Sequence, residues 1–408
     1  MSLARRHQLH PRTVRLVQTG FAGIALAALL AGLLPPGVYS KDLQVEYLTA
    51  WAWRDGADIF TPLTELSARY FPLPTEQFAH PSPHPPVLAL LAIPLTCLPF
   101  PVVATLWLAF NLFLLLTVGR WLGFSVSGSL ALALWPPLLS VLSIGQFELA
   151  VLVLAMLGWR AAAAGRDWHA GLWLGVAAAI KVYPVLFVVP YAARRRWRVA
   201  LAAAAVILVG QVGNLVAAGG SGFLRYYGDI LPAVSHFYMH TVLNSSPYAA
   251  LLRLFGGPSD VTPLIHAPAV VVPLAMLVSL SSCVALAMLE PEAAPVAALV
   301  GLPAVWNYYA VLALPQIVAL LRFGGARLRV IVVIAAASFT VPLARFVFQI
   351  WSGLLPWSAA AAPTAALLTA VQPAGFIGLL LLSLEMHARA RRSKESGTPP
   401  APARPVAA

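Results

Sequence analysis

The sequence contains few charged residues and almost no cysteine. Charged residues make up 10% of the 408 residues, whereas an average soluble domain carries roughly 25%. So few charges cannot cover a water-facing surface of ordinary polarity, which excludes a chain of soluble domains. The two cysteines, Cys97 and Cys283, both lie in apolar stretches. We therefore expect neither a disulfide framework nor a thiolate metal site.

Nucleotide-binding glycine motifs are also missing. The sequence contains neither a P-loop nor the Rossmann glycine pattern, both of which cradle phosphates at the start of a helix. A nucleotide-linked substrate is therefore not expected. We also find no internal repeat, and internal repeats are common in secondary transporters. A lipid or solute transporter thus remains only an alternative interpretation, as does a scaffold within an envelope-synthesis complex.

Apolar residues dominate what is present. They form 60% of the chain, and the mean hydropathy is +0.82. Long continuous apolar segments predict an all-α polytopic membrane protein. We expect one integral membrane domain over residues 1–385, followed by a basic, Pro/Ala-rich disordered tail over 386–408.

The excess of basic residues predicts the topology. The net charge of +12 comes from 26 Lys and Arg against 14 Asp and Glu. In a membrane protein such residues collect in cytoplasmic loops, so nucleic acid is not an expected partner. Both termini are predicted to be cytoplasmic, and the polar segments 36–84 and 219–262 to be extracytoplasmic loops. Full spans are predicted at 16–35, 101–119, 124–142, 147–162, 199–217, 263–289, 328–347 and 359–384.

Three further apolar segments fit a full span poorly. Residues 85–98 give a helix of about 21 Å, too short for a hydrocarbon core of roughly 30 Å, so it should lie in the outer leaflet. Segments 169–193 and 294–321 are each flanked at both ends by charged residues, and both ends should be cytoplasmic. Each is therefore predicted to form a hairpin of two short helices. The total is about 10–12 transmembrane helices.

The first polar loop carries an acidic residue at the membrane surface. Asp42 follows the first predicted span by a few residues, and Glu46 shares its face if the segment is helical. The segment 44–60 is rich in Trp and Tyr, which favour the headgroup level. A carboxylate in this place can act as general base on a sugar hydroxyl of a membrane-bound substrate. Solvation of a loop is the alternative role for both acids.

Further candidate residues lie on the same predicted side or at membrane depth. Ionisable residues within the membrane are costly and are commonly functional. Glu148 is therefore a candidate sugar ligand and Lys181 a candidate phosphate ligand, and a pair between the two is the alternative role. Candidate substrate contacts elsewhere are His84, Gln146, Arg225, Asn244 and Tyr308. His236 and His240 have the i,i+4 spacing of metal ligands, but few acids are near them and no metal or other cofactor is expected.

A series of motifs in the same order resembles a known family. Asp42 is followed by Tyr47, by Gly56, and by the aromatic-Thr-Pro triplet at 60–62. The remaining motifs come in this order: His84-Pro85-Pro86, Trp107, Asn111, Gly145-Gln146, Lys181-x-x-Pro184, Arg196-Trp197-Arg198 and Asn244-Ser245-Ser246. The chain resembles glycosyltransferase family 87 of the GT-C superfamily over about residues 40–260, and elsewhere in hydropathy alone.

The resemblance implies a fold and an activity. It implies a GT-C-type helical bundle that transfers a sugar from a polyprenyl-phosphate donor to a lipid or glycan acceptor outside the cell membrane, with inversion. Mannose is the expected sugar, and an arabinofuranosyltransferase is the alternative within the family. The family's catalytic base corresponds to Asp42. Two positions depart from the family pattern: Glu148 replaces an Asn, and Tyr308 replaces a His.

Overall fold

The structure is a computed structural model that describes residues 17–24, 40–71, 79–241, 243–257, 262–339 and 362–395. Within these residues every regular element is a helix and no strand is present. The all-α prediction is therefore confirmed. The first predicted span, 16–35, is described only at 17–24, where it is helical. The other residues of that span lie outside the described part of the chain.

The elements of the first half alternate long helices with short, proline-bounded ones. They are α2 (Lys41–Arg54), α3 (Leu63–Tyr70), α4 (Val87–Ala92), η1 (Ile93–Cys97), α5 (Phe100–Trp121), α6 (Val126–Ala131), η2 (Leu132–Leu134), α7 (Pro136–Ile144), α8 (Glu148–Ala163), α9 (Asp167–Ile180), η3 (Tyr183–Val188) and α10 (Val189–Ala193).

The second half begins with the longest continuous run of helix. Its elements are α11 (Trp197–Arg225), the π-helical turn η4 (Tyr226–Ile230), α12 (Leu231–His240), α13 (Pro247–Phe255), η5 (Pro268–Val270), α14 (Val271–Met288), η6 (Pro291–Ala293), α15 (Ala294–Gly301), η7 (Asn307–Ala313), α16 (Leu314–Phe323), α17 (Ala326–Ser338) and α20 (Ala362–Glu395).

Several helices are built to face lipid. By length and composition, four helical segments of the described residues can cross a membrane, or five if a bent pair is counted. The four are Phe100–Trp121, Trp197–His240, Pro268–Met288 and Ala366–Ser393. Their outer faces expose large apolar side chains such as Val209 at 71% and Met276 at 68%, which would be unfavourable in water. The chain is a multi-pass membrane protein.

The segment predicted to span the membrane at 124–142 is bent and is not one continuous helix. The helices Val126–Leu134 and Pro136–Ile144 meet at 85°. Trp135 between them has an extended backbone. The cause is the pair Pro136-Pro137, because proline disfavours a helical conformation in the preceding residue and lacks the N–H that would continue the helix.

The chain turns back on itself in the predicted hairpin 169–193. Helix α9 ends at Ile180, Lys181 is extended, and η3 and α10 lead back. The two ends meet, because the Arg196 guanidinium pairs with Asp167 and donates to the Ala162 carbonyl oxygen at 2.8 Å. Both basic boundaries therefore lie on one side of the molecule.

The second predicted hairpin, 294–321, also has neighbouring ends. Helix α15 leads in, η7 and α16 lead back, and α16 contacts η6 just before α15. Arg194 links the end of the first hairpin to the end of α14, just before the second hairpin, since its guanidinium donates to the Leu289 carbonyl oxygen at 2.8 Å. Short helices that meet at depth leave polar backbone and side chains facing the interior, where a site can form.

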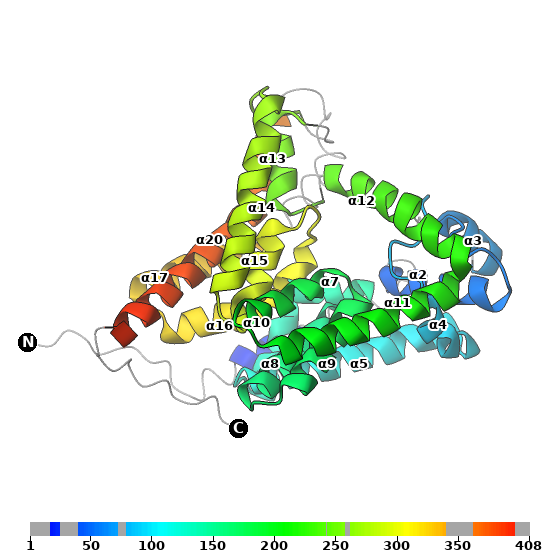
Figure 1. The fold of residues 1–408 in the computed structure, drawn as a ribbon, viewed down its shortest axis with the longest axis horizontal. Coiled ribbons are helices and arrows are strands. Elements are labelled where there is room, and N and C mark those ends of the chain that lie inside the picture. The colour runs from blue at the N-terminus through cyan, green and yellow to red at the C-terminus, as the bar shows by residue number, and fades with distance from the viewer. Residues whose placement is uncertain are drawn as a thin grey trace, which may run out of the picture.

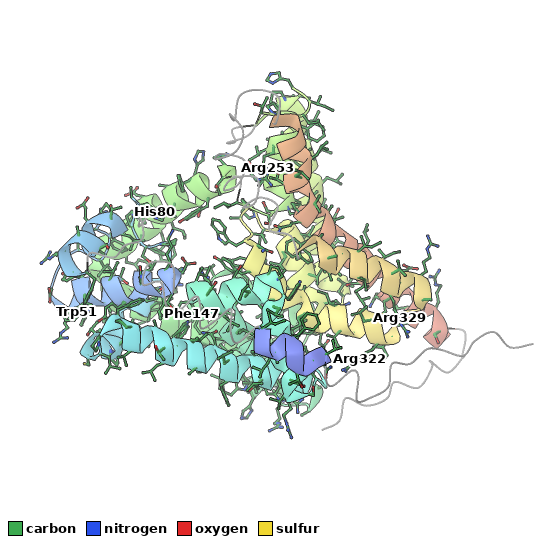
Figure 2. The ribbon with its side chains drawn as sticks, turned by 180° about the vertical axis from the view of Figure 1, so that it is seen from behind. Trp51, His80, Phe147, Arg253, Arg322 and Arg329 are labelled. Carbon is green, nitrogen blue, oxygen red and sulfur yellow. The ribbon has the colours of Figure 1, made fainter. Side chains whose placement is uncertain are left out.

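The helices form two groups joined by α12 (Figure 1). In one group α4, α5, α8, α9 and α11 run side by side, and in the other α13 and α17 pack on α20. Helix α12 crosses the space between α3 and α13. Figure 2 shows Trp51 and His80 on one side of the molecule and Arg322 and Arg329 on the other. The arrangement separates the aromatic first loop from the basic turns.

Both predicted polar loops contain helices. Helix α11 continues past Gly219, whose positive φ of 69° bends it, into η4 and α12. Side chains of η4 and α12, including Tyr226 and Val234, share a small apolar core with Leu48 and Leu63 of the first loop. The Tyr226 hydroxyl donates to the Pro83 carbonyl oxygen at 3.0 Å. The two segments thus hold each other in place.

The last helix is longer than the predicted span. Helix α20 continues to Glu395, so it includes the first ten residues of the tail predicted at 386–408. Residues 396–408 lie outside the described residues. So do residues 340–361, which include the end of the span predicted at 328–347.

Candidate active site

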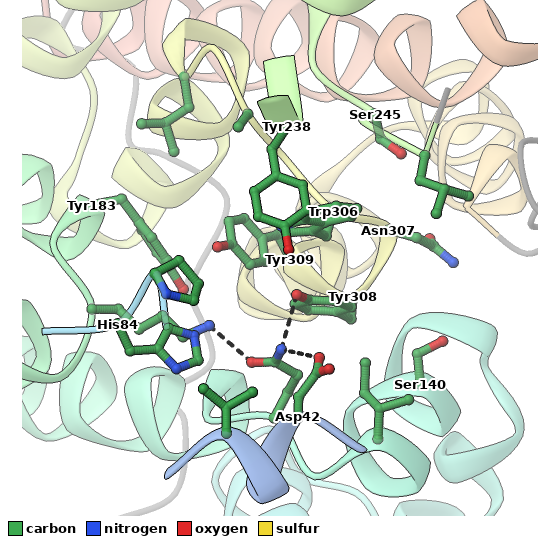
Figure 3. A pocket seen from close by; sticks show the side chains of 18 of the residues that line it. Asp42, His84, Ser140, Tyr183, Tyr238, Ser245, Trp306, Asn307, Tyr308 and Tyr309 are labelled. Carbon is green, nitrogen blue, oxygen red and sulfur yellow. Dashed lines mark hydrogen bonds between the residues drawn. The ribbon is translucent and has the colours of Figure 1, made fainter. Parts of the chain in front are cut away.

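A cavity of about 930 Å³ lies where the two loops and the two hairpins meet (Figure 3). Its lining comes from α2, from the His84 segment, from α7, from the break at Lys181, from α12 and from the segment 302–309. Most of the lining is apolar, and a few polar groups converge on its centre. Ligand pockets in proteins commonly have this composition.

Asp42 is positioned by a tight contact between the first loop and α7. The Ser40 amide donates to the Ser143 carbonyl oxygen at 2.7 Å. Gly145 ends α7 with a φ of 78°, and a Cβ there would lie 2.9 Å from Leu43 Cβ. Only glycine accommodates both conditions well. The Trp107 indole donates to the Gly145 carbonyl oxygen at 2.9 Å, so this turn places Gln146 next to Asp42.

Gln146 connects the polar groups at the centre of the cavity. Its Nε2 donates to Asp42 Oδ2 and to the Tyr308 hydroxyl oxygen at 3.0 Å. Its Oε1 accepts from Lys181 Nζ at 2.8 Å. The ammonium can only donate, which fixes the orientation of the amide. A carboxylate from the first loop is therefore bonded to both hairpin breaks through one side chain.

Lys181 and Glu148 form an ion pair at the wall of the cavity. Lys181 Nζ lies 3.0 Å from Glu148 Oε1, and the Glu148 side chain is fully buried. Removing either charge from water is costly, and the pair offsets part of that cost. Lys181 lines the cavity, whereas Glu148 does not. Glu148 therefore reaches a bound ligand only through Lys181.

Glu46 and His84 form a second pair. His84 Nδ1 is bonded to the Glu46 carboxylate, whose side chain is only 4% exposed. His84 lines the cavity, while Glu46 lines a small neighbouring one. With Nδ1 occupied by the carboxylate, the imidazole has Nε2 available for another group.

Burial raises the pKa of the Asp42 carboxyl above its ordinary value. The hydrogen bond from Gln146 and the nearby His84, Lys181 and Lys41 act in the opposite direction and favour the carboxylate. A base with a raised pKa accepts a proton more readily once it is ionised. These opposing effects suit a carboxylate that takes up a proton during a reaction.

Two of the predicted site residues lie elsewhere. Arg225 pairs with Asp58 at 2.8 Å, and both side chains are about half exposed. Asn244 is buried, and its amide binds the backbone: Nδ2 donates to Pro303 O at 2.9 Å, and Oδ1 accepts from Ser246 N and Val305 N. Neither residue lines the cavity. Asn244 instead holds the loop before α13 against the segment that contributes Tyr308.

Sequence reasoning missed the neutral residues of the cavity. They include Ser140, Tyr183, Tyr238, Ser245, Trp306, Asn307, Tyr309 and Gln372. The predicted meeting point of two short helices at 306–309 was the available signal, because a break at membrane depth indicates polar surroundings. Ser245 belongs to the motif Asn244-Ser245-Ser246, but no comparable pattern marks the rest, which arrive from distant segments.

The residues that the structure describes contain no cluster of three or more His, Cys, Asp or Glu suited to a metal ion. His236 and His240 lie on one face of α12 with their Nε2 atoms 3.2 Å apart. A pair of imidazoles alone is too few for a structural or catalytic zinc site.

The fold and the cavity define a class of protein. A multi-pass α-helical membrane protein holds a partly exposed carboxylate beside cationic and aromatic groups, in a largely apolar cavity. The chain belongs to glycosyltransferase family 87, whose sequence profile matches residues 83–315, more than half of the chain. The matched segment includes His84, Gln146 and Lys181, while Asp42 precedes it and is brought to it by the fold.

Two curated relatives are similar to part of the chain. A polyprenol-phosphate-mannose-dependent alpha-(1-2)-phosphatidylinositol pentamannoside mannosyltransferase of Mycolicibacterium smegmatis is 30% identical over 244 residues, 57% of each chain. A protein of the same description from Mycobacterium tuberculosis is 28% identical over 206 residues, 47% of each chain. The matches thus span about half the length of these relatives. No solved structure matches the chain.

Proposed function

We propose that the protein is an inverting mannosyltransferase that uses a polyprenyl-phosphate mannose donor and a lipid or glycan acceptor. The placement of Asp42 carries the proposal: a carboxylate faces an apolar, lipid-sized cavity and is bonded through Gln146 to a buried lysine. Family membership and the descriptions of the two relatives support the donor class.

In the proposed reaction Asp42 acts as general base. It takes the proton of an acceptor hydroxyl while that oxygen forms a bond to the anomeric carbon of the donor sugar. The bond from that carbon to the phosphate oxygen breaks, and its electron pair leaves with the lipid phosphate. Attack opposite the leaving group inverts the anomeric centre, so a β-linked donor gives an α product.

The cationic residues of the cavity are suited to the phosphate. Lys41, His84 and Lys181 carry all the basic groups of the lining. Groups of this kind stabilise charge that develops on a departing phosphate. Glu46 orients His84, and Glu148 balances the charge of Lys181. In this proposal Glu46 and Glu148 position the cationic side chains and do not touch the substrate. Tyr308 holds Gln146 in place by accepting a hydrogen bond from its amide.

The choice of donor is tested with purified protein in lipid nanodiscs. We expect transfer of radiolabel from polyprenyl-phosphate mannose to a mannosylated lipid, and little or none from polyprenyl-phosphate arabinofuranose. Preferential transfer of arabinofuranose would favour the other activity of the family. Movement of an intact labelled lipid across the bilayer without transfer would instead favour the transporter interpretation.

The reaction should also lose rate in acid. The Asp42 carboxyl must be ionised to accept a proton, and burial raises its pKa. The rate should therefore fall as the pH drops through a pKa above the ordinary aspartate value of about 3.9, and level off above it. Measuring kcat/KM against pH for the free enzyme checks this. A profile that is flat down to pH 4 would contradict a role for Asp42 as base.

We propose that the cavity opens on the extracytoplasmic side of the cell membrane, with both termini in the cytoplasm. Supporting this, Figure 2 shows Arg322 and Arg329 on the side of the molecule away from His80. Native Cys97 and Cys283 are exposed and are first replaced by serine. A cysteine at Ser235 should then react with an impermeant thiol reagent in whole cells, and one at Arg195 should react only after lysis. The reverse pattern would contradict this topology.

A further inference from the structure

The charges of the cavity are confined to one part of its lining. Every Lys, His and Asp of the lining lies at 41–42, 84 or 181. The rest of its polar lining includes a group without formal charge: Ser140, Tyr238, Ser245, Trp306, Asn307 and Gln372. We call this group the neutral wall. Figure 3 shows His84 on one side of Asp42, with Ser140 and Asn307 on the other.

The neutral wall is held rigidly. The Trp306 ring stacks on Tyr308 at an interplanar angle of 11° and meets the Tyr238 ring edge-on at 5.0 Å. The Ser245 hydroxyl donates to Gln372 Oε1 of α20 at 2.6 Å, and its amide donates to the Val305 carbonyl oxygen at 2.6 Å. A preorganised wall binds a ligand without the cost of ordering its own side chains.

One polar atom of the wall lacks a partner. Asn307 Oδ1 is buried and accepts no hydrogen bond from any described residue. A buried acceptor left without a donor is unfavourable, and a ligand hydroxyl would satisfy it. The neighbouring Trp306 also lines the cavity, and the C–H groups of a sugar ring pack well against an indole because its π system is electron-rich. An aromatic surface with neutral amide and hydroxyl groups suits a carbohydrate better than a phosphate.

We propose that the neutral wall is the acceptor subsite, that it binds a sugar ring of the acceptor, and that Asn307 selects for it. This inference rests on the proposed function. Inverting transfer requires the acceptor oxygen to attack from the side opposite the leaving phosphate. His84, a proposed phosphate ligand, lies on the opposite side of Asp42 from Ser140 and Asn307 of the wall (Figure 3). The acceptor is therefore a sugar-bearing molecule, and a simple lipid alcohol is a poor substitute.

The test uses octyl α-mannoside and octanol as acceptor probes, with polyprenyl-phosphate mannose as donor and full-length protein in nanodiscs. The wild type should transfer mannose to octyl mannoside at least about tenfold more efficiently than to octanol. Asn307→Ala should raise the KM for octyl mannoside about fivefold, the cost of roughly one lost hydrogen bond. Binding of radiolabelled donor should stay unchanged, which also shows that the variant is folded.

A second substitution tests the aromatic surface. Trp306→Leu should raise the same KM by more than Trp306→Phe, because phenylalanine keeps a π face. Thr117→Ala is the control, since the Thr117 hydroxyl donates to Phe113 O within α5 at 2.9 Å and Thr117 does not line the cavity. Thr117→Ala should change neither the KM for octyl mannoside nor the binding of the donor.

Different failures contradict different claims. Equal use of octanol and octyl mannoside by the wild type would overturn the subsite while leaving the proposed function in place. So would an unchanged acceptor KM in both Asn307→Ala and Trp306→Leu, or weaker donor binding in place of weaker acceptor binding. A wild type that binds no polyprenyl-phosphate sugar and transfers none would overturn the proposed function itself.

Discussion

Asp42→Asn should reduce transfer about 10²–10⁴-fold, which is the usual contribution of a general base. The substitution keeps the size and polarity of the side chain and removes only its ability to accept a proton. Donor binding should change little, because the proposed phosphate ligands are Lys181 and His84. The measurement is the single-turnover rate at saturating donor, with both proteins at equal levels in the membrane.

Glu46→Gln is the matched control for this substitution. Glu46 lies one helical turn from Asp42 but contacts the cavity only through His84. Glutamine keeps a hydrogen bond to the imidazole and removes the charge, so a much smaller loss is expected. Full activity in Asp42→Asn would contradict the mechanism. Equal losses in the two variants would contradict the assignment of the base to Asp42.

Lys181→Met should destabilise the protein strongly. It leaves the fully buried Glu148 carboxylate without the ammonium 3.0 Å away, and breaking a buried ion pair on one side costs about 3–5 kcal/mol. The double variant Lys181→Met with Glu148→Gln should regain most of that stability, because no unpaired charge remains. It should still transfer poorly, since the proposed phosphate ligand is missing. The measurement is the thermal unfolding midpoint in detergent.

Arg225→Met provides the comparison with an exposed pair. The Arg225 and Asp58 side chains are 51% and 48% exposed, and such pairs contribute at most about 1 kcal/mol. Its unfolding midpoint should stay close to that of the wild type. A double variant at Lys181 and Glu148 that is no more stable than Lys181→Met alone would contradict the charge-balance role of Glu148.

The fold class followed from composition, and the hairpins followed from charge. In a chain with so few charged residues and with long continuous apolar segments, helices satisfy the backbone hydrogen bonds within the membrane. Basic boundaries at both ends of 169–193 indicated the turn that the Arg196 to Asp167 pair closes. The bend at Trp135 was missed, although Pro136-Pro137 marks it, because hydropathy averaged over a window does not register a break in direction.

The centre of the site was partly visible in the sequence. Asp42, Gln146 and Lys181 stand out because each is polar in an apolar context, and they meet in the cavity. Arg225 and Asn244 stood out for the same reason, yet their partners are a surface carboxylate and the backbone. Spacing along the chain cannot separate these cases, because which partner a polar group finds depends on segments distant in sequence. The neutral wall was missed for the same reason.

The central claim is most directly tested by offering purified protein two forms of the same labelled sugar. The protein in nanodiscs is supplied with a mannosylated lipid acceptor and with either polyprenyl-phosphate mannose or a nucleotide-linked mannose. The account predicts labelled product from the polyprenyl-phosphate donor alone, with an α linkage. Product from the nucleotide donor, or none from the polyprenyl-phosphate donor, would contradict it.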